Sequence, residues 1–327
     1  MPRPKAFVTR VIPEAGIERL AAVYDAEVNR EDRQLSPQEI AGHAKGCQAL
    51  ITLLTDRVDG ALLDLCPDVR IVANVAVGYD NVDVPAATER GVWVANTPGV
   101  LTETTADLAW ALLMATARRL GEAERFVRAG RYHGWGILML LGGDVHGKTL
   151  GIVGFGRIGQ AVAKRARGFE MRVLYTDAQR VSGAVEHDCR ATFVDKATLL
   201  AESDFVSLHV PLMPQTHHWL GETEFMAMRS TAYVVNTSRG PVIDEAALAK
   251  ALRSGWIAGA GLDVFEREPQ VHPDLLACEN ALLLPHIGSA SIETRDRMAT
   301  IAADNCIAFA RGERPPTAVN EPVQAKA

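Results

Sequence analysis

Short apolar runs alternate with stretches of helical periodicity along most of the chain. In the first part, apolar runs predict strands at residues 6–9, 49–54, 70–75 and 92–95. Between them, apolar residues spaced three and four apart predict helices at residues 14–23, 37–44, 60–65 and 84–90. Strands separated by helices in this order predict a parallel sheet that is covered by helices on both faces.

A second series of the same kind begins at residue 149. It predicts strands at 149–153, 172–176, 191–193, 205–209, 232–236, 258–263 and 281–284, with helices that include 195–201 and 245–254. A long helix is expected before it, at 101–129, and is apolar on all sides over 108–115. The last helix, 292–310, is expected to return to the first sheet, since the second sheet is already complete. These elements predict an α/β protein with two doubly wound parallel sheets.

Composition narrows the classes of partner. The chain has 327 residues and a formal net charge of −6, without a block of lysine or arginine, which argues against nucleic acid and anionic membranes as partners. No apolar run is long enough to span a membrane, and the first residues lack the apolar core of a signal peptide, so we expect a cytoplasmic protein. Five scattered cysteines without close spacing predict reduced thiols, and no motif predicts a metal site.

A glycine-rich loop follows the first strand of the second series. Its residues are Gly154, Phe155, Gly156, Arg157, Ile158 and Gly159, and a helical pattern runs from 160 to about 168. The next strand ends in Asp177, about 20 residues beyond the loop, where an acid that binds the ribose of a dinucleotide is expected. The loop therefore predicts a dinucleotide site. The acid Asp177 predicts a preference for NAD(H) as the cofactor. Arg180, three residues further on, leaves NADP(H) open as the alternative cofactor.

Three polar residues directly follow predicted strands of the second sheet. They are Arg239, Glu268 and His286. Each has an ordinary structural alternative: Arg239 could pair with Asp244, Glu268 could be a solvated charge, and His286 could begin a helix. Because the carboxyl ends of parallel strands share one edge, we expect the three to reach the same crevice as the dinucleotide.

These motifs resemble those of the D-isomer-specific 2-hydroxyacid dehydrogenase family, and within it the glyoxylate/hydroxypyruvate reductases. The matching segments are 77–83 (VGYDNVD), 102–109 (TETTADLA), 147–159 (GKTLGIVGFGRIG), 236–244 (NTSRGPVID), 261–269 (GLDVFEREP) and 285–288 (PHIG). The resemblance implies a Rossmann NAD(P) domain, residues 101–287, inserted into a flavodoxin-like substrate domain formed by 1–100 and 288–327.

The resemblance also implies the site residues. Arg239, Glu268 and His286 would be catalytic, with His286 donating a proton to the keto oxygen while Glu268 favours and orients the imidazolium. Substrate would contact Leu53, Trp135, Arg239 and the N–H groups of Val77 and Gly78. Besides the glycine loop, cofactor contacts are expected from Thr105, Asp177, Pro211, Thr216, Thr237, Ser238, Asp263, His286 and Gly288. We expect NAD(P)H-dependent reduction of small 2-keto acids such as glyoxylate and hydroxypyruvate, with the 2-keto or 2-hydroxy acid as the small-molecule partner.

The apolar segment 132–141 is expected to contact a second copy of the chain. Intrachain packing is the alternative, but by the resemblance this is a dimer loop in which Trp135 reaches the partner's substrate pocket. Ile137 stands where the family often has proline, so this loop departs from the usual pattern.

Two alternatives stay open, another dehydrogenase of the family and a cofactor-sensing scaffold, whereas a formate dehydrogenase is disfavoured. Phosphoglycerate or phosphonate dehydrogenases would need further cations near Arg239, and the chain is shorter than one with an appended regulatory domain. A formate dehydrogenase would have Gln in place of Glu268. A cofactor-sensing scaffold like the related corepressors would keep the fold, although we see no extension for binding protein partners.

Overall fold

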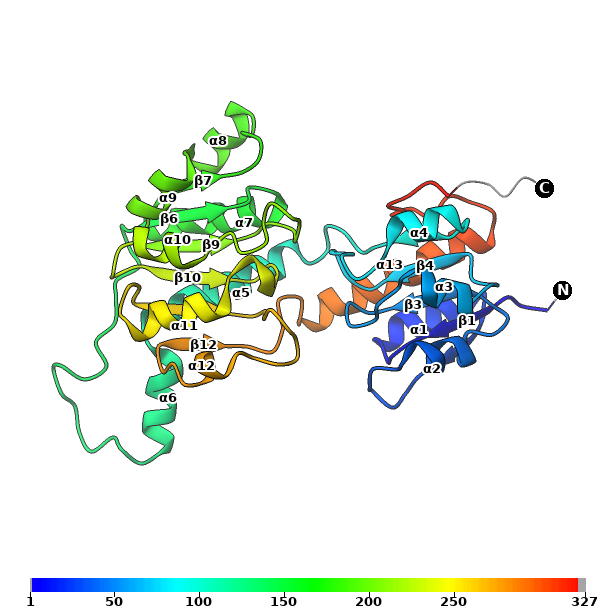
Figure 1. The fold of residues 1–327 in the computed structure, drawn as a ribbon, viewed down its shortest axis with the longest axis horizontal. Coiled ribbons are helices and arrows are strands. Elements are labelled where there is room, and N and C mark those ends of the chain that lie inside the picture. Colours follow the sequence, from blue (N-terminus) through cyan, green and yellow to red (C-terminus); the bar gives the residue numbers. More distant parts are fainter. Residues whose placement is uncertain (1, 323–327) are drawn as a thin grey trace. The chain divides into compact units, whose positions relative to one another are not determined.

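The protein is described by a computed structural model that covers residues 2–322. Its chain divides into two compact units (Figure 1). The first comprises the residues up to Leu101 together with those from Ser289 onward, and the second comprises Thr102–Gly288. Each unit contains one parallel β-sheet with helices on both faces, which confirms the predicted α/β class.

The first unit contains a five-stranded parallel sheet in the order β2-β1-β3-β4-β5. This is the strand order of flavodoxin-like folds. The strands are β1 (Lys5–Val8), β2 (Asp25–Val28), β3 (Cys47–Thr52), β4 (Ile71–Asn74) and β5 (Trp93–Ala95). The helices are α1 (Glu14–Ala21), α2 (Pro37–His43), α3 (Gly60–Leu65), α4 (Val84–Glu89) and α13 (Ile292–Ala310).

The last helix, α13, packs against α1 in the first unit. A Cβ placed on Gly16 would lie 2.6 Å from the Cβ of Ala299, so the two helices approach as closely as only glycine allows. Tyr24 lies just after α1 and donates a hydrogen bond from its hydroxyl to the carbonyl of Cys306 at 2.8 Å. The contact explains why residues far apart in the chain share one core.

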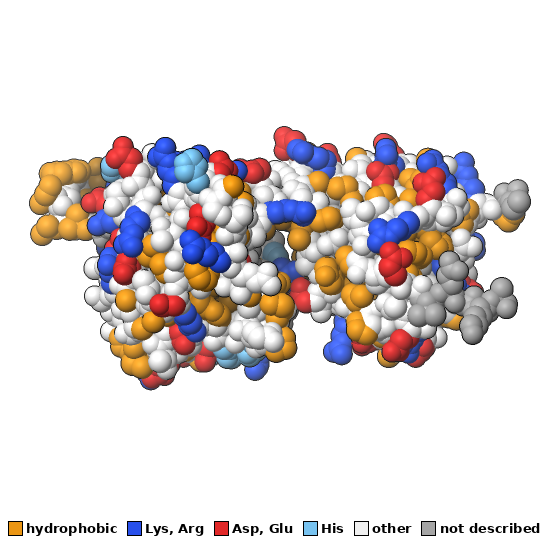
Figure 2. Space-filling view, turned by 90° about the horizontal axis from the view of Figure 1, so that it is seen from above, with side chains coloured by type: hydrophobic (Ala, Val, Ile, Leu, Met, Phe, Trp, Pro, Cys, Tyr) orange, Lys and Arg blue, Asp and Glu red, His pale blue; other side chains and the backbone are white. Residues whose placement is uncertain are grey.

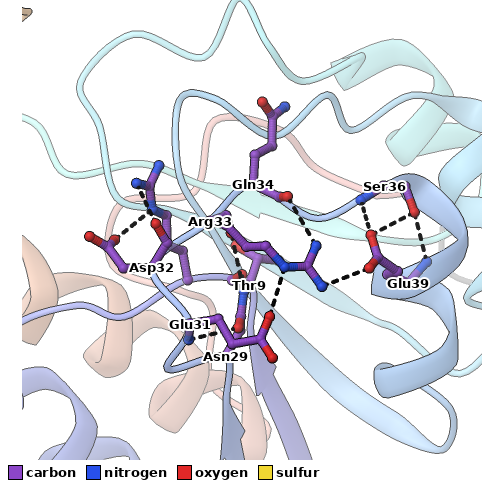
Figure 3. Close-up of polar contacts among 9 residues, drawn as sticks. Thr9, Asn29, Glu31, Asp32, Arg33, Gln34, Ser36 and Glu39 are labelled. Carbon is purple, nitrogen blue, oxygen red and sulfur yellow. Dashed lines mark hydrogen bonds and ion pairs between the residues drawn. The ribbon is translucent and has the colours of Figure 1, made fainter.

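Helix α2 begins with a capping box. The Ser36 hydroxyl accepts a hydrogen bond from the N–H of Glu39, and the Glu39 carboxylate accepts one from the N–H of Ser36. Arg33 bridges Glu31 and Glu39 at 2.7 and 2.8 Å, as Figure 3 shows. These contacts order the loop between β2 and α2.

The second unit contains a seven-stranded parallel sheet in the order β12-β11-β10-β9-β6-β7-β8. Chain order reverses at the boundary between β6 and β9, where open α/β sheets bind ligands. The strands are β6 (Thr149–Val153), β7 (Arg172–Thr176), β8 (Ala191–Phe193), β9 (Phe205–Leu208), β10 (Tyr233–Asn236), β11 (Gly259–Leu262) and β12 (Ala281–Leu283). The helices are α5 (Thr102–Ala117), α6 (Leu120–Arg128), α7 (Arg157–Ala166), α8 (Gly183–Cys189), α9 (Lys196–Glu202), α10 (Glu222–Ala227), α11 (Glu245–Arg253) and α12 (Pro273–Leu276), with 3-10 turns at Arg167–Phe169 and Gly240–Val242.

Helices cover both faces of this sheet, because successive side chains of a strand point to opposite sides. Val234 of β10 packs in the core beneath α9 and α11, whereas its neighbour Val235 packs in the core beneath α5 and α7. Near-continuous apolar strands are therefore required, and the sequence has them.

The prediction of a single helix at 101–129 is wrong. The structure has two helices, α5 and α6, which are separated at Arg119 by a backbone in the left-handed region (φ 52°). The Arg119 guanidinium binds Glu122 at 2.8 Å and the carbonyl of Leu141 at 3.2 Å, so tertiary contacts hold the break. The nearest glycine, Gly121, lies inside the first turn of α6 rather than at the break.

Four short elements were not predicted: β2, α8, α10 and α12. Strand β2 has the sequence DAEV and lies at an edge of its sheet, where polar side chains replace the apolar run of a central strand. Across the described part of the chain, no helix has the length and apolar character needed to cross a membrane.

Candidate active site

The glycine loop after β6 has the backbone that close contact with a dinucleotide requires. Gly154 has φ +88°, and a Cβ on it would lie 2.7 Å from the carbonyl oxygen of His209. A Cβ on Gly159 would lie 2.2 Å from the carbonyl oxygen of Gly154, so this glycine permits close packing of α7 on the strand. Around Gly156, by contrast, no heavy atom lies within 4 Å of the Cβ position. The loop thus leaves open space at the N-terminus of α7, where a pyrophosphate would bind.

Asp177, at the end of β7, lies against this loop. Its Oδ2 accepts a hydrogen bond from the N–H of Phe155 at 2.6 Å. The carboxylate is only partly exposed. This position fits the ribose of a dinucleotide whose pyrophosphate lies on the loop.

Arg239 lies in a tight loop after β10. Asn236 shapes the loop, since its Nδ2 donates to the carbonyl of Arg239 at 2.9 Å and its Oδ1 accepts from the N–H of Ser238 at 3.0 Å. Gly240 follows, and a Cβ there would lie 1.8 Å from the carbonyl carbon of Phe265. The loops after β10 and β11 therefore contact each other backbone to backbone.

Glu268 and His286 form a hydrogen-bonded pair after β11 and β12. Nδ1 of His286 lies 2.7 Å from Oε2 of Glu268, and the other carboxylate oxygen accepts from the N–H of Phe265 at 3.0 Å. His286 has φ +54°, in the left-handed region. With Nδ1 bound to Glu268, the imidazole has Nε2 left to act on another molecule.

Charge interactions place Arg239 near this pair. Burial would raise the pKa of Glu268, but the hydrogen bond and positive charge of His286, the N–H of Phe265 and the charge of Arg239 together hold that pKa below its usual value. The carboxylate is therefore ionised at neutral pH. The ionised carboxylate accepts the hydrogen bond at Nδ1 and so fixes the orientation of the His286 ring.

Asp263 anchors the segment after His286. It is 1% exposed, and its two oxygens accept hydrogen bonds from the N–H groups of Ile287 and Gly288, each at 2.7 Å. Burial raises its pKa. Thr105 on α5 donates to the carbonyl of Gly288 at 3.2 Å, so both predicted cofactor residues also hold the loop.

The remaining predicted cofactor residues of this unit follow β9 and β10. The Thr216 hydroxyl donates to the carbonyl of Pro211 at 2.6 Å and closes a turn. Thr237 is 9% exposed, and its hydroxyl is buried without a hydrogen-bond partner among the described residues. Such an unpaired hydroxyl fits a site that a bound polar group completes.

The predicted substrate loop, Val77–Gly78, lies in the first unit after β4. Asn96 donates to the carbonyl of Val77 at 2.7 Å, and the N–H of Thr97 donates to the carbonyl of Ala76 at 2.8 Å. Since N–H and C=O point in opposite directions across a trans peptide, these bonds turn the N–H groups of Val77 and Gly78 away from residues 96–97. Leu53 follows β3 at the same edge of the sheet and is partly buried.

Two groups that shape the site were missed in the sequence. Glu245, at the start of α11, is 4% exposed and accepts hydrogen bonds from the N–H groups of Glu266 and His272 at 2.7 and 3.2 Å, so it holds both sides of the Glu268 loop. Asn74 donates to the carbonyl of Gly78 at 3.1 Å. The sequence offered one signal for each. Glu245 is an acid in the first turn of a helix, and Asn74 is an asparagine at the end of an apolar strand.

Comparison with known proteins supports this reading of the second unit. Residues 110–288 match the family model described as the D-isomer specific 2-hydroxyacid dehydrogenase, NAD binding domain. The chain belongs to the D-isomer specific 2-hydroxyacid dehydrogenase family. The protein is therefore an enzyme of the dehydrogenase type, and the matching segment is the NAD binding domain of the family.

Relatives that match nearly the whole chain support the same family assignment. The chain is 54% identical to a glyoxylate reductase of Korarchaeum cryptofilum, covering 98% of this chain and 97% of the relative, and 53% identical to one of Thermococcus gammatolerans, with the same coverage. Among solved structures, an NADPH-dependent glyoxylate/hydroxypyruvate reductase from Sinorhizobium meliloti in complex with NADP and malonate has a TM-score of 0.88 at 34% identity, and covers 99% of both chains.

Proposed function

We propose that this protein reduces glyoxylate and hydroxypyruvate to the corresponding 2-hydroxy acids with a reduced nicotinamide cofactor. The Glu268–His286 pair, at 2.7 Å, carries the proposal. Its two residues follow β11 and β12, and these strands belong to the same sheet as β6, which leads into the glycine loop. The names of the relatives, glyoxylate reductases at 50–54% identity, support the substrate class.

In this mechanism His286 supplies the proton. When bound, the cofactor supplies the hydride for the keto carbon. Nε2 of the imidazolium donates to the keto oxygen, and neutral His286 takes the proton back when the hydroxy acid is oxidised. Glu268 keeps the ring oriented.

The substrate carboxylate would be held by Arg239 and by the N–H groups of Val77 and Gly78. A guanidinium matches a carboxylate with two parallel hydrogen bonds. Leu53 would line the pocket, and Trp135 would reach the substrate pocket of a second copy of the chain. Asn96 would act as a positioning residue, because it orients the peptide between Val77 and Gly78.

We assign the cofactor to the second unit and the substrate-carboxylate loop to the first. The proposed cofactor contacts are Thr105, Gly154, Phe155, Gly156, Arg157, Ile158, Gly159, Asp177, Pro211, Thr216, Thr237, Ser238, Asp263, His286 and Gly288. We favour NAD(H) because the Asp177 carboxylate accepts hydrogen bonds from a ribose diol and repels a 2′-phosphate. The five cysteines are all free and buried, which supports a reducing compartment such as the cytoplasm.

Oxidation of NADH and NADPH with a panel of keto acids tests the function. We expect turnover of glyoxylate and hydroxypyruvate, with a higher kcat/KM for NADH than for NADPH. The panel includes pyruvate and phosphohydroxypyruvate. A preference for the phosphorylated acid would indicate a phosphoglycerate dehydrogenase, and no turnover of any keto acid would favour the scaffold alternative.

We further propose a homodimer formed through the loop between α6 and β6. Trp135, Ile137 and Leu138 are 71–78% exposed, and hydrophobic side chains gather on the projecting lobe at the left of Figure 2. A contiguous apolar surface of this kind is typical of an interface.

Light scattering after size-exclusion chromatography should give about twice the 35.3 kDa mass of one chain. Replacing both Ile137 and Leu138 with serine should shift the protein toward monomer, because it removes apolar area from the interface. Ile292→Ser is the matched control, since Ile292 is 80% exposed but belongs to the first unit. A monomeric unaltered protein would contradict the proposed dimer.

A further inference from the structure

A charged cluster lies between β7 and α8, next to the proposed ribose position. Arg180 binds the carboxylate of Glu186 with two parallel contacts, from Nε to Oε1 and from Nη2 to Oε2, each 2.8 Å. The hydroxyl of Tyr175 donates to Oε1 of the same carboxylate at 2.8 Å. Glu186 therefore accepts three hydrogen bonds and is 13% exposed, whereas Arg180 is 64% exposed.

Tyr175 connects this cluster to the glycine loop. Its ring stacks on Phe155, with ring centroids 4.1 Å apart and an angle of 24° between the ring planes. Phe155 in turn donates its N–H to Asp177. The Glu186 carboxylate is thus held in a fixed position relative to the residues that would bind the adenosine ribose.

The cluster decides the charge that a 2′-phosphate would meet. NADP(H) differs from NAD(H) by a phosphate group that carries about −1.5 to −2 charge at neutral pH, and such groups are bound by arginine forks. Arg180, three residues beyond Asp177, is the obvious fork in this segment. Two of its donor groups already bind Glu186, so the Arg180–Glu186 pair contributes no net charge beside the Asp177 carboxylate.

We propose that Glu186 is a determinant of cofactor specificity: it holds Arg180 in an ion pair and so disfavours NADP(H) relative to NAD(H). The inference rests on the proposed binding of the cofactor at the glycine loop. It identifies a residue on α8, outside the glycine loop and the end of β7, that controls whether Arg180 is available to a phosphate.

The pairing persists over the working pH range. The hydrogen bonds from Arg180 and Tyr175 lower the pKa of Glu186 to about 2. The carboxylate therefore stays ionised at every pH at which the enzyme is assayed. Proton uptake by Glu186 cannot release Arg180, and only a substitution or a competing anion can.

Glu186→Gln tests the inference by nucleotide binding. Dissociation constants are measured by calorimetry for NADPH, for NADH, and for 2′,5′-ADP, a probe with the 2′-phosphate but without nicotinamide. We expect NADPH and 2′,5′-ADP to bind about tenfold more tightly to Glu186→Gln, as a new charge-assisted hydrogen bond allows. NADH should change by less than about twofold, a difference of a few tenths of a kcal/mol.

Two further variants test whether the effect comes from the Arg180–Glu186 pair. Glu202→Gln removes the same charge from the pair of Arg172 with Glu202 at the other end of β7, and it should change none of the three constants. The single variant Arg180→Gln should leave NADPH binding unchanged, because Arg180 is held by Glu186. In the Glu186→Gln background it should abolish the gain.

The outcomes separate the inference from the proposed function. Unchanged NADPH binding by Glu186→Gln, an equal gain in Glu202→Gln, or a tenfold loss of NADPH binding in Arg180→Gln would each overturn the inference alone. Failure of the unaltered protein to bind either dinucleotide would overturn the proposed function and the inference with it.

Discussion

Replacing His286 with asparagine is expected to lower kcat for keto-acid reduction by about 100- to 10,000-fold, the usual contribution of a general acid. The dissociation constant of NADH should change little, because the variant leaves the glycine loop untouched. Asparagine is the suitable substitute, since His286 has φ +54° and asparagine tolerates the left-handed region better than alanine does. Steady-state kinetics with glyoxylate, together with NADH binding by calorimetry, measures both quantities.

The chain offers a matched control in the same unit. His218 also has a positive φ, 49°, and its Nε2 lies 2.6 Å from Oε1 of Glu266. His218→Asn therefore breaks a second histidine–glutamate pair at the same backbone conformation, and kcat should stay within about twofold, the range of a surface substitution away from the chemistry. An equal loss of kcat in both variants would contradict the role of His286.

The pH dependence checks the protonation state behind this result. Reduction requires the imidazolium, so kcat/KM for the keto acid should fall as pH rises through the apparent pKa of the Glu268–His286 pair. The pKa of Glu268 is lowered, so its carboxylate stays charged at neutral pH. Oxidation of the hydroxy acid requires neutral imidazole and should show the opposite slope. A flat profile in the unaltered protein would contradict proton donation by His286.

Replacing Arg239 with alanine is expected to raise KM for the keto acid and also to lower kcat. The combined loss in kcat/KM should be about 100-fold, which corresponds to one charge-assisted pair of hydrogen bonds to a carboxylate. Arg239→Lys should recover only part of this loss, because an ammonium keeps the charge but lacks the planar fork. Initial rates over a range of glyoxylate concentrations separate KM from kcat.

Arg253→Lys is the control for this prediction. Arg253 also forms a two-point pair with a carboxylate, that of Asp274 at 3.0 and 3.1 Å, and lies on α11 of the same unit. Its replacement should leave both kinetic constants unchanged. Unaltered kinetics in Arg239→Ala would exclude that residue from substrate binding.

The strands of both sheets were largely predictable. In the second unit, β6, β7 and β8 have the predicted bounds, and α13 in the first unit does as well. The apolar runs of central parallel strands are unambiguous, because such strands are buried on both faces. Prediction failed at β2, whose edge position permits polar residues, and at Arg119, where contacts with Glu122 and Leu141 hold the break and the nearest glycine, Gly121, lies inside α6.

For the site, chain direction explains what could be predicted. Arg239, Glu268 and His286 each follow a strand, and parallel strands bring their carboxyl ends to one edge. The structure pairs Glu268 with His286 and places the charge of Arg239 near them. The supporting residues Glu245 and Asn96 were not predicted, because their partners are backbone groups 19–27 residues away.

Patterns along the chain were sufficient to predict the two parallel sheets, the glycine loop and the polar residues at the strand ends. These follow from local periodicity, from backbone conformations that only glycine adopts readily, and from the common direction of parallel strands. The pairing of particular side chains became known only from the fold: Arg180 binds Glu186, and the Asp263 carboxylate binds the loop after His286. A charged side chain has many partners of suitable chemistry along the chain, and the folded backbone brings only one of them within reach.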